Sequence, residues 1–335
     1  MRKLINNPDA VVEEMLRGLA LVNPGVRLEP ESRVIGRKDF GKKVGLVSGG
    51  GSGHEPTHAG YVGPGMLDAA VVGNVFASPS ADAIVKGIEM ANGGMGVLLI
   101  VKNYSGDIMN FGLAAELARD LGIEVAEVIV KDDVAVPDST FSTGRRGVAG
   151  TIFVHKLAGA AAEAGLNLFE VTRVAQKAID NVRSFGVSLS SCVLPAVGKP
   201  GFEMADDEME LGMGIHGEPG LERVKTMIAF EAAEYMIGKI LIDLDYRDRE
   251  CAVMVNGLGG TPLMELYIMA AEVDKLIKKR GLDPIRYYVG EFMTSLDMVG
   301  ASISILRLDD ELKQYLFAPA DTPGLKEKGK CWRCQ

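Results

Sequence analysis

Residues 45–60 bring together more chemically active side chains than any other short stretch of the chain, in the order GLVSGGGSGHEPTHAG. Glycines after a strand-like run are typical of loops whose backbone comes close to a phosphate. The letters HEPTH also match H-E-x-x-H, the pattern of zinc peptidases. The two interpretations predict different ligands, so each has to meet its own further requirements.

Neither pattern is complete. A P-loop needs a lysine and a hydroxyl residue where this sequence has His54 and Glu55. The dinucleotide pattern G-x-G-x-x-G also fails, because His54 stands in place of its third glycine. Zinc binding would need a formed helix, and Pro56 follows Gly53 so closely that only a first turn can include it. We therefore expect a ligand-approaching loop without metal, and a His58 that packs on the sheet from a helix.

Three other side chains suit acid–base chemistry. His54 ends the glycine loop, where an imidazole can exchange a proton with a bound polar molecule, and a turn histidine is the alternative. The segment KNYSGDIMNF places Lys102 and Asp107 at the end of a strand-like run. Asp107 is a candidate base for a substrate hydroxyl, or else the N-cap of the next helix. Lys102 forms an ion pair with Asp107, binds the same ligand, or is a solvated lysine.

A fourth candidate is His216, in the segment GMGIHGEPG. A neutral imidazole between small residues is a nucleophile that can add to a carbonyl carbon. His54 and His216 both stand in glycine-rich segments that continue into Glu-Pro, although the chain has only four histidines. The acidic run MADDEMEL before His216 is a magnesium site or, in the plainer interpretation, a charged surface loop.

The composition limits the class of partner. With 335 residues, 47% hydrophobic content and a net charge of −9, the chain can fill two cores and offers no basic surface for nucleic acid. We expect no membrane span and no signal peptide, hence a cytoplasmic protein. Four cysteines cannot form a disulfide framework, and the terminal CWRCQ with Cys331 and Cys334 is half a metal site, a redox pair or a frayed tail.

The pattern of strands and helices predicts two layered α/β domains. Strand-like runs at 43–48, 96–101 and 125–130 alternate with helix-like segments at 79–92, 107–121 and 148–165. After Ser184 the pattern of strand-like and helix-like segments changes, so we predict an α/β domain at 1–184, a second at 185–328 and a flexible tail at 329–335. In the second, we expect strands at 187–195, 209–217 and 251–257, a helix near 221–240, and another that begins at Thr261-Pro262 with an N-cap and a first-turn proline. We expect both sheets to be mixed and largely parallel, with ligand-binding loops where strands end.

Several long segments, taken together, resemble the dihydroxyacetone kinase family, specifically its substrate-binding subunit. The resemblance runs from about residue 1 to about 320 and implies a homodimer of two α/β domains, with substrate bound between the domains. The segments are SGGGSGHEPTHAGYVGPGM, GVLLIVKNYSGDIMNF, GRRGVAGT, VGKPGFEMADDEMELGMGIHGEPG, NGLGGTPLMELY and TSLDMVGASISIL.

The resemblance also implies a role for each candidate residue. His216 looks like the histidine that holds the ketone as a hemiaminal through Nε2. His54 looks like the acid/base residue, and Asp107 looks like the base that faces the terminal hydroxyl. The other implied substrate contacts are Gly51, Ser52, Gly53 and Lys102. Covalent capture requires a carbonyl, so it rejects glycerol, which ordinary hydrogen bonding discriminates poorly.

The resemblance leaves the phosphoryl donor open. Members that use ATP carry a second, nucleotide-binding domain, and this sequence ends at Gln335 without one. We therefore expect ATP or ADP and magnesium on a separate kinase subunit, recharged by a phosphoenolpyruvate phosphotransferase protein or by nucleotide exchange, in glycerol metabolism. The alternatives are a silent ketone sensor that works with a transcription regulator, and a kinase for a related ketotriose or ketotetrose.

Overall fold

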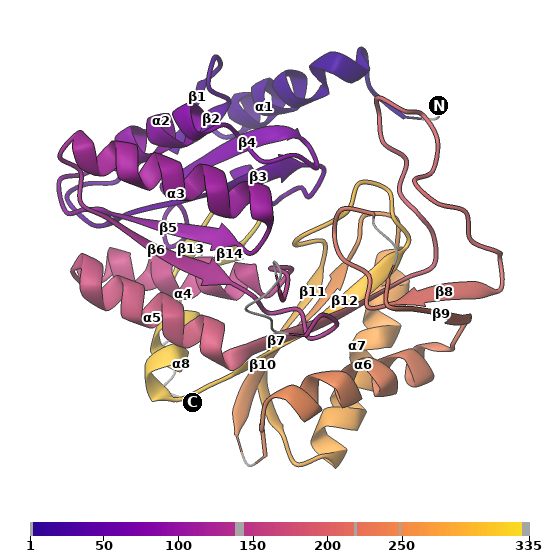
Figure 1. The fold of residues 1–335 in the computed structure, drawn as a ribbon. Helices are drawn as coiled ribbons and strands as arrows, with labels where there is room; N and C mark the ends of the chain where they lie inside the picture. Colours follow the sequence, from indigo (N-terminus) through magenta and orange to yellow (C-terminus); the bar gives the residue numbers. More distant parts are fainter. Residues whose placement is uncertain (1–2, 138–143, 218–219, 248, 330–335) are drawn as a thin grey trace. The chain divides into compact units, whose positions relative to one another are not determined.

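The chain folds into two compact units, each built from separate segments. The computed structural model describes residues 3–137, 144–217, 220–247 and 249–329 (Figure 1). Of these, the N-terminal unit takes 3–130, 153–179 and 310–329, and the C-terminal unit takes the remainder. The sequence predicts contiguous domains at 1–184 and 185–328, whereas each observed unit combines segments of both predicted domains. Most of the predicted tail, with Cys331 and Cys334, lies outside the described residues.

Specific contacts hold the final segment to the N-terminal unit. The Lys156 ammonium is buried and donates to the backbone oxygen of Tyr315, at 2.7 Å. Glu311 accepts hydrogen bonds from Arg173 and Lys177. A buried lysine needs such an acceptor, so this segment packs with the N-terminal unit although it follows the other unit in sequence.

The N-terminal unit contains a six-stranded mixed sheet. Its strand order is β1-β2-β4-β3-β5-β6. The pairs from β4 to β6 are parallel, and β2 pairs with β1 and β4 antiparallel. The three strands predicted in this half are confirmed as β3, β5 and β6, while β1, β2 and β4 were not predicted. The bounds are β1 Val26–Glu29, β2 Val34–Arg37, β3 Gly45–Ser52, β4 Ala69–Val75, β5 Val97–Lys102 and β6 Val125–Val130.

Helices cover this sheet. α2 and α3 contribute apolar residues to one core with β2 to β5, among them Ile84, Ile88 and Phe111, while α4 and α5 lie on the other side of the sheet (Figure 1). The Ser80 side chain caps α2 by accepting from the Ala83 N–H, which fixes where the helix begins. The bounds are α1 Val11–Val22, α2 Ala81–Ala91, α3 Ser105–Asp120, α4 Thr151–Glu163, α5 Leu168–Asn181 and α8 Asp310–Leu316; short elements are η1 Pro8–Ala10, η2 Ala59–Tyr61, β13 Ala320–Asp321 and β14 Lys326–Glu327.

The sheet of the C-terminal unit is mixed but mostly antiparallel, which corrects the prediction of a largely parallel sheet. Its strand order is β11-β10-β12-β7-β8-β9, and only β10 with β11 is parallel among the described pairs. That pair is joined by helix α7, as a parallel crossover requires, whereas β8 and β9 form a hairpin. The bounds are β7 Val182–Ser188, β8 Glu208–Leu211, β9 Glu222–Lys225, β10 Glu250–Gly257, β11 Asp283–Gly290 and β12 Gly300–Arg307.

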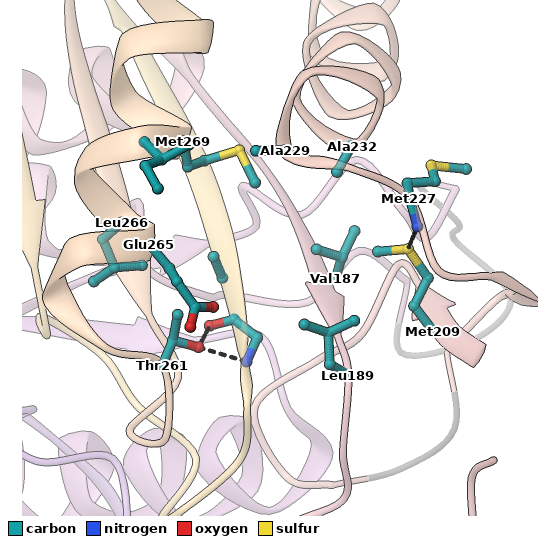
Figure 2. Close-up of a pocket in the computed structure, with 13 residues that line it drawn as sticks. Val187, Leu189, Met209, Met227, Ala229, Ala232, Thr261, Glu265, Leu266 and Met269 are labelled. Atoms are coloured by element: carbon teal, nitrogen blue, oxygen red, sulfur yellow. Dashed lines mark hydrogen bonds between the residues drawn. The ribbon is translucent and has the colours of Figure 1, made fainter. Parts of the chain in front are cut away.

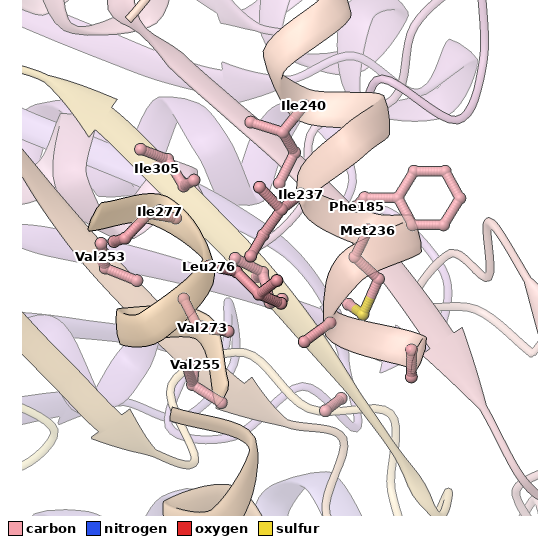
Figure 3. Packing of buried hydrophobic residues seen from close by; sticks show 14 of the residues in the cluster. Phe185, Met236, Ile237, Ile240, Val253, Val255, Val273, Leu276, Ile277 and Ile305 are labelled. Carbon is pink, nitrogen blue, oxygen red and sulfur yellow. The ribbon is translucent and has the colours of Figure 1, made fainter. Parts of the chain in front are cut away.

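Helices α6 (Ala229–Asp243) and α7 (Leu263–Lys279) bury their apolar faces against this sheet. Figure 3 shows Ile237 and Ile277 facing the strands, in a cluster that also includes Phe185, Val253 and Ile305. α6 begins at Ala229 rather than near 221, because β9 occupies the preceding residues.

Helix α7 starts one residue later than predicted. Pro262 is its N-cap rather than its first helical residue. The Thr261 hydroxyl does not cap the helix; it donates to the Gly300 oxygen at 2.6 Å and accepts from the Gly300 N–H at 2.7 Å. Thr261 thus ties the helix start to β12. Among the described residues, no helix is long and apolar enough to cross a membrane.

Candidate functional site

The glycines of the opening motif lie inside a strand rather than in a loop, which corrects the sequence interpretation. β3 continues through Ser52 because β4 pairs with it along its length and β5 pairs with its first half. A Cβ on Gly51 would lie 2.6 Å from the Ala77 nitrogen, so glycine is needed for the loop after β4 to pack here. The Ser52 hydroxyl donates to the Gly73 oxygen, and the Gly53 N–H donates to the Glu55 carboxylate.

His54 follows directly after this strand and is fully buried. Its ring stacks on Phe76, with centroids 5.0 Å apart and an angle of 15° between the planes. Phe76 has a φ of +58°, a strained conformation for an aromatic residue that turns the chain after β4. The stacking fixes the plane of the imidazole. Phe76 was not predicted as part of the site.

Lys102 and Asp107 form a buried ion pair. Lys102 ends β5, and its Nζ lies 3.7 Å from Asp107 Oδ2, which is an ionic contact rather than a hydrogen bond. Burial lowers the pKa of Lys102, and the Asp107 carboxylate opposes that shift. The alternative of a solvated lysine is wrong, because the side chain is inaccessible.

Asp107 lies in the first turn of α3, whose N-cap is Tyr104, so the alternative of an N-cap aspartate is also wrong. Its Oδ1 accepts a hydrogen bond from the Ser78 hydroxyl. The residue is buried at the N-terminal end of the helix, beside the Lys102 ammonium. Ser78 was missed in the sequence because it precedes its helix in an ordinary turn, NVFASPSAD.

The HEPTH motif lies in turns, so it has no regular helix that would align two histidines on a metal. His58 is the N-cap of η2 rather than a residue within a helix, although it is buried as expected. Burial holds the pKa of His58 well below its usual range, and Lys102 adds to the shift. Within the described ranges, no three His, Cys, Asp or Glu side chains are grouped so that they could hold a metal ion.

His58 has a partner that the sequence does not reveal. Its Nδ1 lies 3.0 Å from Nε2 of His155 in α4 and 3.2 Å from the Ser48 hydroxyl. His155 is also fully buried, and burial lowers its pKa to about 3, with a contribution from Lys102. Both imidazoles are therefore neutral at physiological pH. They stand 97 positions apart in sequence, so no local pattern could pair them.

His216 lies in the C-terminal unit, in a loop beyond β8. The predicted strand 209–217 ends at Leu211, and the segment from Gly212 onward is irregular. Met213 and Ile215 are buried, while His216 is partly exposed. Two inward apolar side chains thus anchor the loop and leave the imidazole at the surface of its unit. This placement suits a nucleophile that has to meet a ligand.

An ion pair between the partly exposed Arg146 and the buried Asp133 supports the start of that loop. Arg146 contacts the Asp133 carboxylate at 2.7 Å and donates to the Gly212 oxygen at 2.8 Å. Burial raises the pKa of Asp133 to about 6, although the arginine opposes the shift. Arg146 belongs to the segment GRRGVAGT, so part of that motif serves to hold the backbone that leads to His216.

An apolar hollow of about 180 Å³ lies elsewhere in the C-terminal unit. Figure 2 shows Met269, Leu266 and Val187 on its walls, with Glu265 the only ionisable side chain that lines it. Its lining offers few partners for a small polyhydroxy ligand, whose hydroxyl groups need hydrogen bonds.

The structure places His54 in the same unit as the Lys102–Asp107 ion pair, and His216 in the other unit. The predicted contacts Gly51, Ser52 and Gly53 belong to the same strand end as His54. Strand-end polar residues at one edge of a parallel sheet are the usual surroundings of a ligand. The N-terminal unit thus holds a buried imidazole, a buried carboxylate and a buried ammonium at or just after strand ends.

Comparison with known proteins adds independent information. The model of the Dak1 domain matches residues 17–324. The chain is 52% identical to the "PTS-dependent dihydroxyacetone kinase 1, dihydroxyacetone-binding subunit DhaK" of Listeria innocua, over 96% of this chain and 99% of that protein. It is 42% identical to the "L-erythrulose 1-kinase" of Mycolicibacterium smegmatis, over 97% of this chain but only 58% of that protein. The solved structure of the "Dihydroxyacetone kinase operon co-activator Dha-DhaQ" is similar with a TM-score of 0.90 and 37% identity, over 94% and 98% of the two chains.

Proposed function

The chain belongs to the Dak1 domain family, and from this premise we propose that it is the dihydroxyacetone-binding subunit of a dihydroxyacetone kinase. The observation that carries the proposal is its 52% identity, across nearly the whole of both chains, to a subunit with that name. The site supports it, because a phosphotransferase that acts on an alcohol needs a base beside the hydroxyl, and the buried Asp107 carboxylate contacts the Lys102 ammonium and the Ser78 hydroxyl.

We assign the capture of the ketone to His216. The Nε2 lone pair adds to the carbonyl carbon, the carbonyl oxygen takes up a proton, and the ring loses the proton on Nδ1, so a neutral hemiaminal results. The partly exposed imidazole in an anchored loop supports this role. Since glycerol has no carbonyl group, this step selects the ketone over the triol.

We assign proton transfer to His54 and Asp107. Asp107 accepts the proton of the terminal hydroxyl as the hydroxyl oxygen attacks phosphorus, and the Lys102 ammonium lies 3.7 Å from the carboxylate. His54 exchanges the proton with the oxygen of the captured carbonyl, from a ring plane fixed by Phe76. Gly51, Ser52 and Gly53 would contribute contacts to the ligand at the end of β3.

We place ATP or ADP and magnesium on a separate subunit, which donates the phosphoryl group and is itself recharged by a phosphoenolpyruvate phosphotransferase protein or by nucleotide exchange. The full-length match to a subunit named PTS-dependent supports this, while the erythrulose kinase has a further region that this chain does not match. We place the reaction in glycerol metabolism in the cytoplasm.

The test is an activity assay with and without the partner. The purified chain with dihydroxyacetone, ATP and magnesium should form no dihydroxyacetone phosphate. Addition of a nucleotide-loaded partner subunit should give activity that saturates with the partner, because positioning of the phosphates depends on it. Robust turnover by this chain with ATP alone would contradict the two-part system.

We further propose that the chain is a homodimer through the C-terminal unit. The starts of α6 and α7 expose large apolar side chains, among them Phe230, Met264 and Tyr267. They are next in sequence to Ala229, Glu265 and Leu266, which line the hollow. Exposed apolar groups of this kind are typical of subunit interfaces. Light scattering should give twice the chain mass. Met264→Glu should shift the protein towards monomer, and the control Leu113→Glu, an exposed leucine of α3, should not.

A sensor of the ketone is the second candidate, and the co-activator structure with a TM-score of 0.90 favours it. Both functions would bind dihydroxyacetone, so binding does not separate them. Turnover with a partner subunit supports the kinase, and ketone binding without turnover under any partner supports the sensor. The similarity to an erythrulose kinase makes L-erythrulose the substrate to compare with dihydroxyacetone in the same assay.

A further inference from the structure

The buried histidine pair beside the site has a defined proton arrangement. The Ser48 hydroxyl donates to the Ile100 oxygen at 2.6 Å, so towards His58 it can only accept. The 3.2 Å contact is then a hydrogen bond only with the His58 proton on Nδ1, where that proton also faces His155 Nε2 at 3.0 Å. His58 Nε2 is therefore an acceptor with an available lone pair.

The nearby charge favours the same tautomer. Lys102 lowers the pKa of His58, so the ammonium is close enough to act on the ring. A positive charge stabilises a lone pair that faces it and repels an N–H. Two independent neighbours, Ser48 and Lys102, thus select the tautomer with a bare Nε2.

His58 Nε2 and Lys102 Nζ face the same point of β3. A Cβ placed on Gly50 would lie 3.0 Å from Lys102 Nζ and 3.6 Å from His58 Nε2. Both nitrogens are buried, and in the part of the chain that the structure describes neither has a hydrogen-bond partner. Glycine leaves open the space that a side chain would fill. A donor and an acceptor, both desolvated, converge there.

We propose that Lys102 and His58 bind one hydroxyl-type oxygen beside Gly50, which accepts a hydrogen bond from Lys102 Nζ and donates one to His58 Nε2. An alcohol or a water molecule can do both at once, whereas a carbonyl or an ether cannot donate. His58 thereby becomes a specificity-determining residue, and His155 a positioning residue that holds its ring. The oxygen comes from a hydroxyl of the ligand or from a buried water. The assignment of the oxygen to a ligand hydroxyl rests on the proposed function, whereas the tautomer of His58 does not depend on it.

The first experiment measures the tautomer without any ligand. The full chain is labelled with ¹⁵N-histidine, and the signals of His58 are assigned by their loss in His58→Asn. At pH 7 we expect a neutral ring with its proton on Nδ1 and an Nε2 resonance moved by an accepted hydrogen bond. A proton on Nε2, a doubly protonated ring, or an Nε2 that accepts no hydrogen bond with or without ketone would overturn the proposal.

Dihydroxyacetone then distinguishes the sources of the oxygen. If a ligand hydroxyl supplies it, saturation with the ketone moves the His58 Nε2 resonance; if water supplies it, that resonance keeps its ligand-free position. Both results support the bridge. Should the ketone move none of the four histidines, His216 included, the proposed function fails while the tautomer stands.

Matched variants separate this role from a structural one. In His58→Asn the new amide can replace the Nδ1–H but not Nε2, whereas in His58→Gln the longer side chain carries a carbonyl towards the Nε2 position. With a ligand hydroxyl at the bridge, His58→Asn should weaken dihydroxyacetone binding about tenfold and His58→Gln should restore most of it. Equal loss in both variants, at unchanged thermal stability, would contradict a role for the Nε2 acceptor in ligand binding.

Discussion

Replacement of Asp107 by asparagine tests the chemistry of the site with little change in shape. The amide oxygen can still accept from the Ser78 hydroxyl, but the charge 3.7 Å from Lys102 Nζ is lost. At that separation the attraction is about 4 kcal/mol with an effective dielectric constant of about 20, before desolvation is subtracted. The variant removes the base. It also lowers the pKa of Lys102 further, because the Asp107 charge no longer opposes the effect of burial.

The expected effect is on turnover rather than on capture. General bases contribute about 10² to 10⁴ in rate, so kcat should fall at least about 100-fold, or roughly 2.7 kcal/mol in barrier. Binding of the ketone should persist, since we assign covalent capture to His216. A kcat near that of the wild type would refute the reasoning.

The assay is steady-state formation of dihydroxyacetone phosphate with a nucleotide-loaded partner subunit, at saturating ketone. Asp120→Asn is the matched control, because Asp120 is an exposed carboxylate at the end of the same helix. It should keep wild-type kcat. Thermal unfolding of both variants shows whether a loss of activity comes from a loss of fold, which is necessary to check because Asp107 belongs to a buried ion pair.

Three further predictions concern proton transfer, pH and packing. His54→Asn should retain ketone binding and lose about 100-fold in kcat, measured in the same assay, and unchanged kcat would remove His54 from proton transfer. Because the pKa of His155 falls from 6.5 in the unfolded chain to about 3, stability is fully present above pH 6.5 and falls as the pH is lowered. Between pH 7 and 5 His155 should account for about 2 kcal/mol of that loss in denaturant unfolding, and His155→Gln should show a flatter pH dependence. Gly159→Ala should destabilise the protein by about 1–3 kcal/mol, because its Cβ would lie 2.4 Å from the Gly65 oxygen, whereas Gly112→Ala, with open space around it, should stabilise it by about 0.5–1 kcal/mol in thermal unfolding.

The local part of the site could be predicted from the sequence. Lys102 and Asp107 are five positions apart across a strand end and a helix start, so an alternating α/β pattern was enough to place them together. Where the sequence pattern was misleading, the neighbouring strand determined the secondary structure. The three glycines have little strand propensity, and they form a strand because β4 pairs with each of them.

The remaining part depends on contacts between distant segments. His155 reaches His58 from a helix of another part of the chain, and Ser78 reaches Asp107 from the loop after β4. The strand β4 has small residues and no alternation, because it is buried on both faces, so its pattern gave no signal. The mostly antiparallel second sheet also escaped prediction, since strand direction follows from the connections rather than from composition.

The most direct test of the central claim is carbon NMR of dihydroxyacetone labelled with ¹³C at its carbonyl. On the wild-type chain we predict that the bound signal moves from the ketone region to that of a tetrahedral carbon bonded to oxygen and nitrogen, in a one-to-one ratio with protein. His216→Ala should show no such signal, and glycerol should not compete for its formation. A ligand that remains a ketone on the wild-type protein, or the same tetrahedral signal on His216→Ala, would contradict the account.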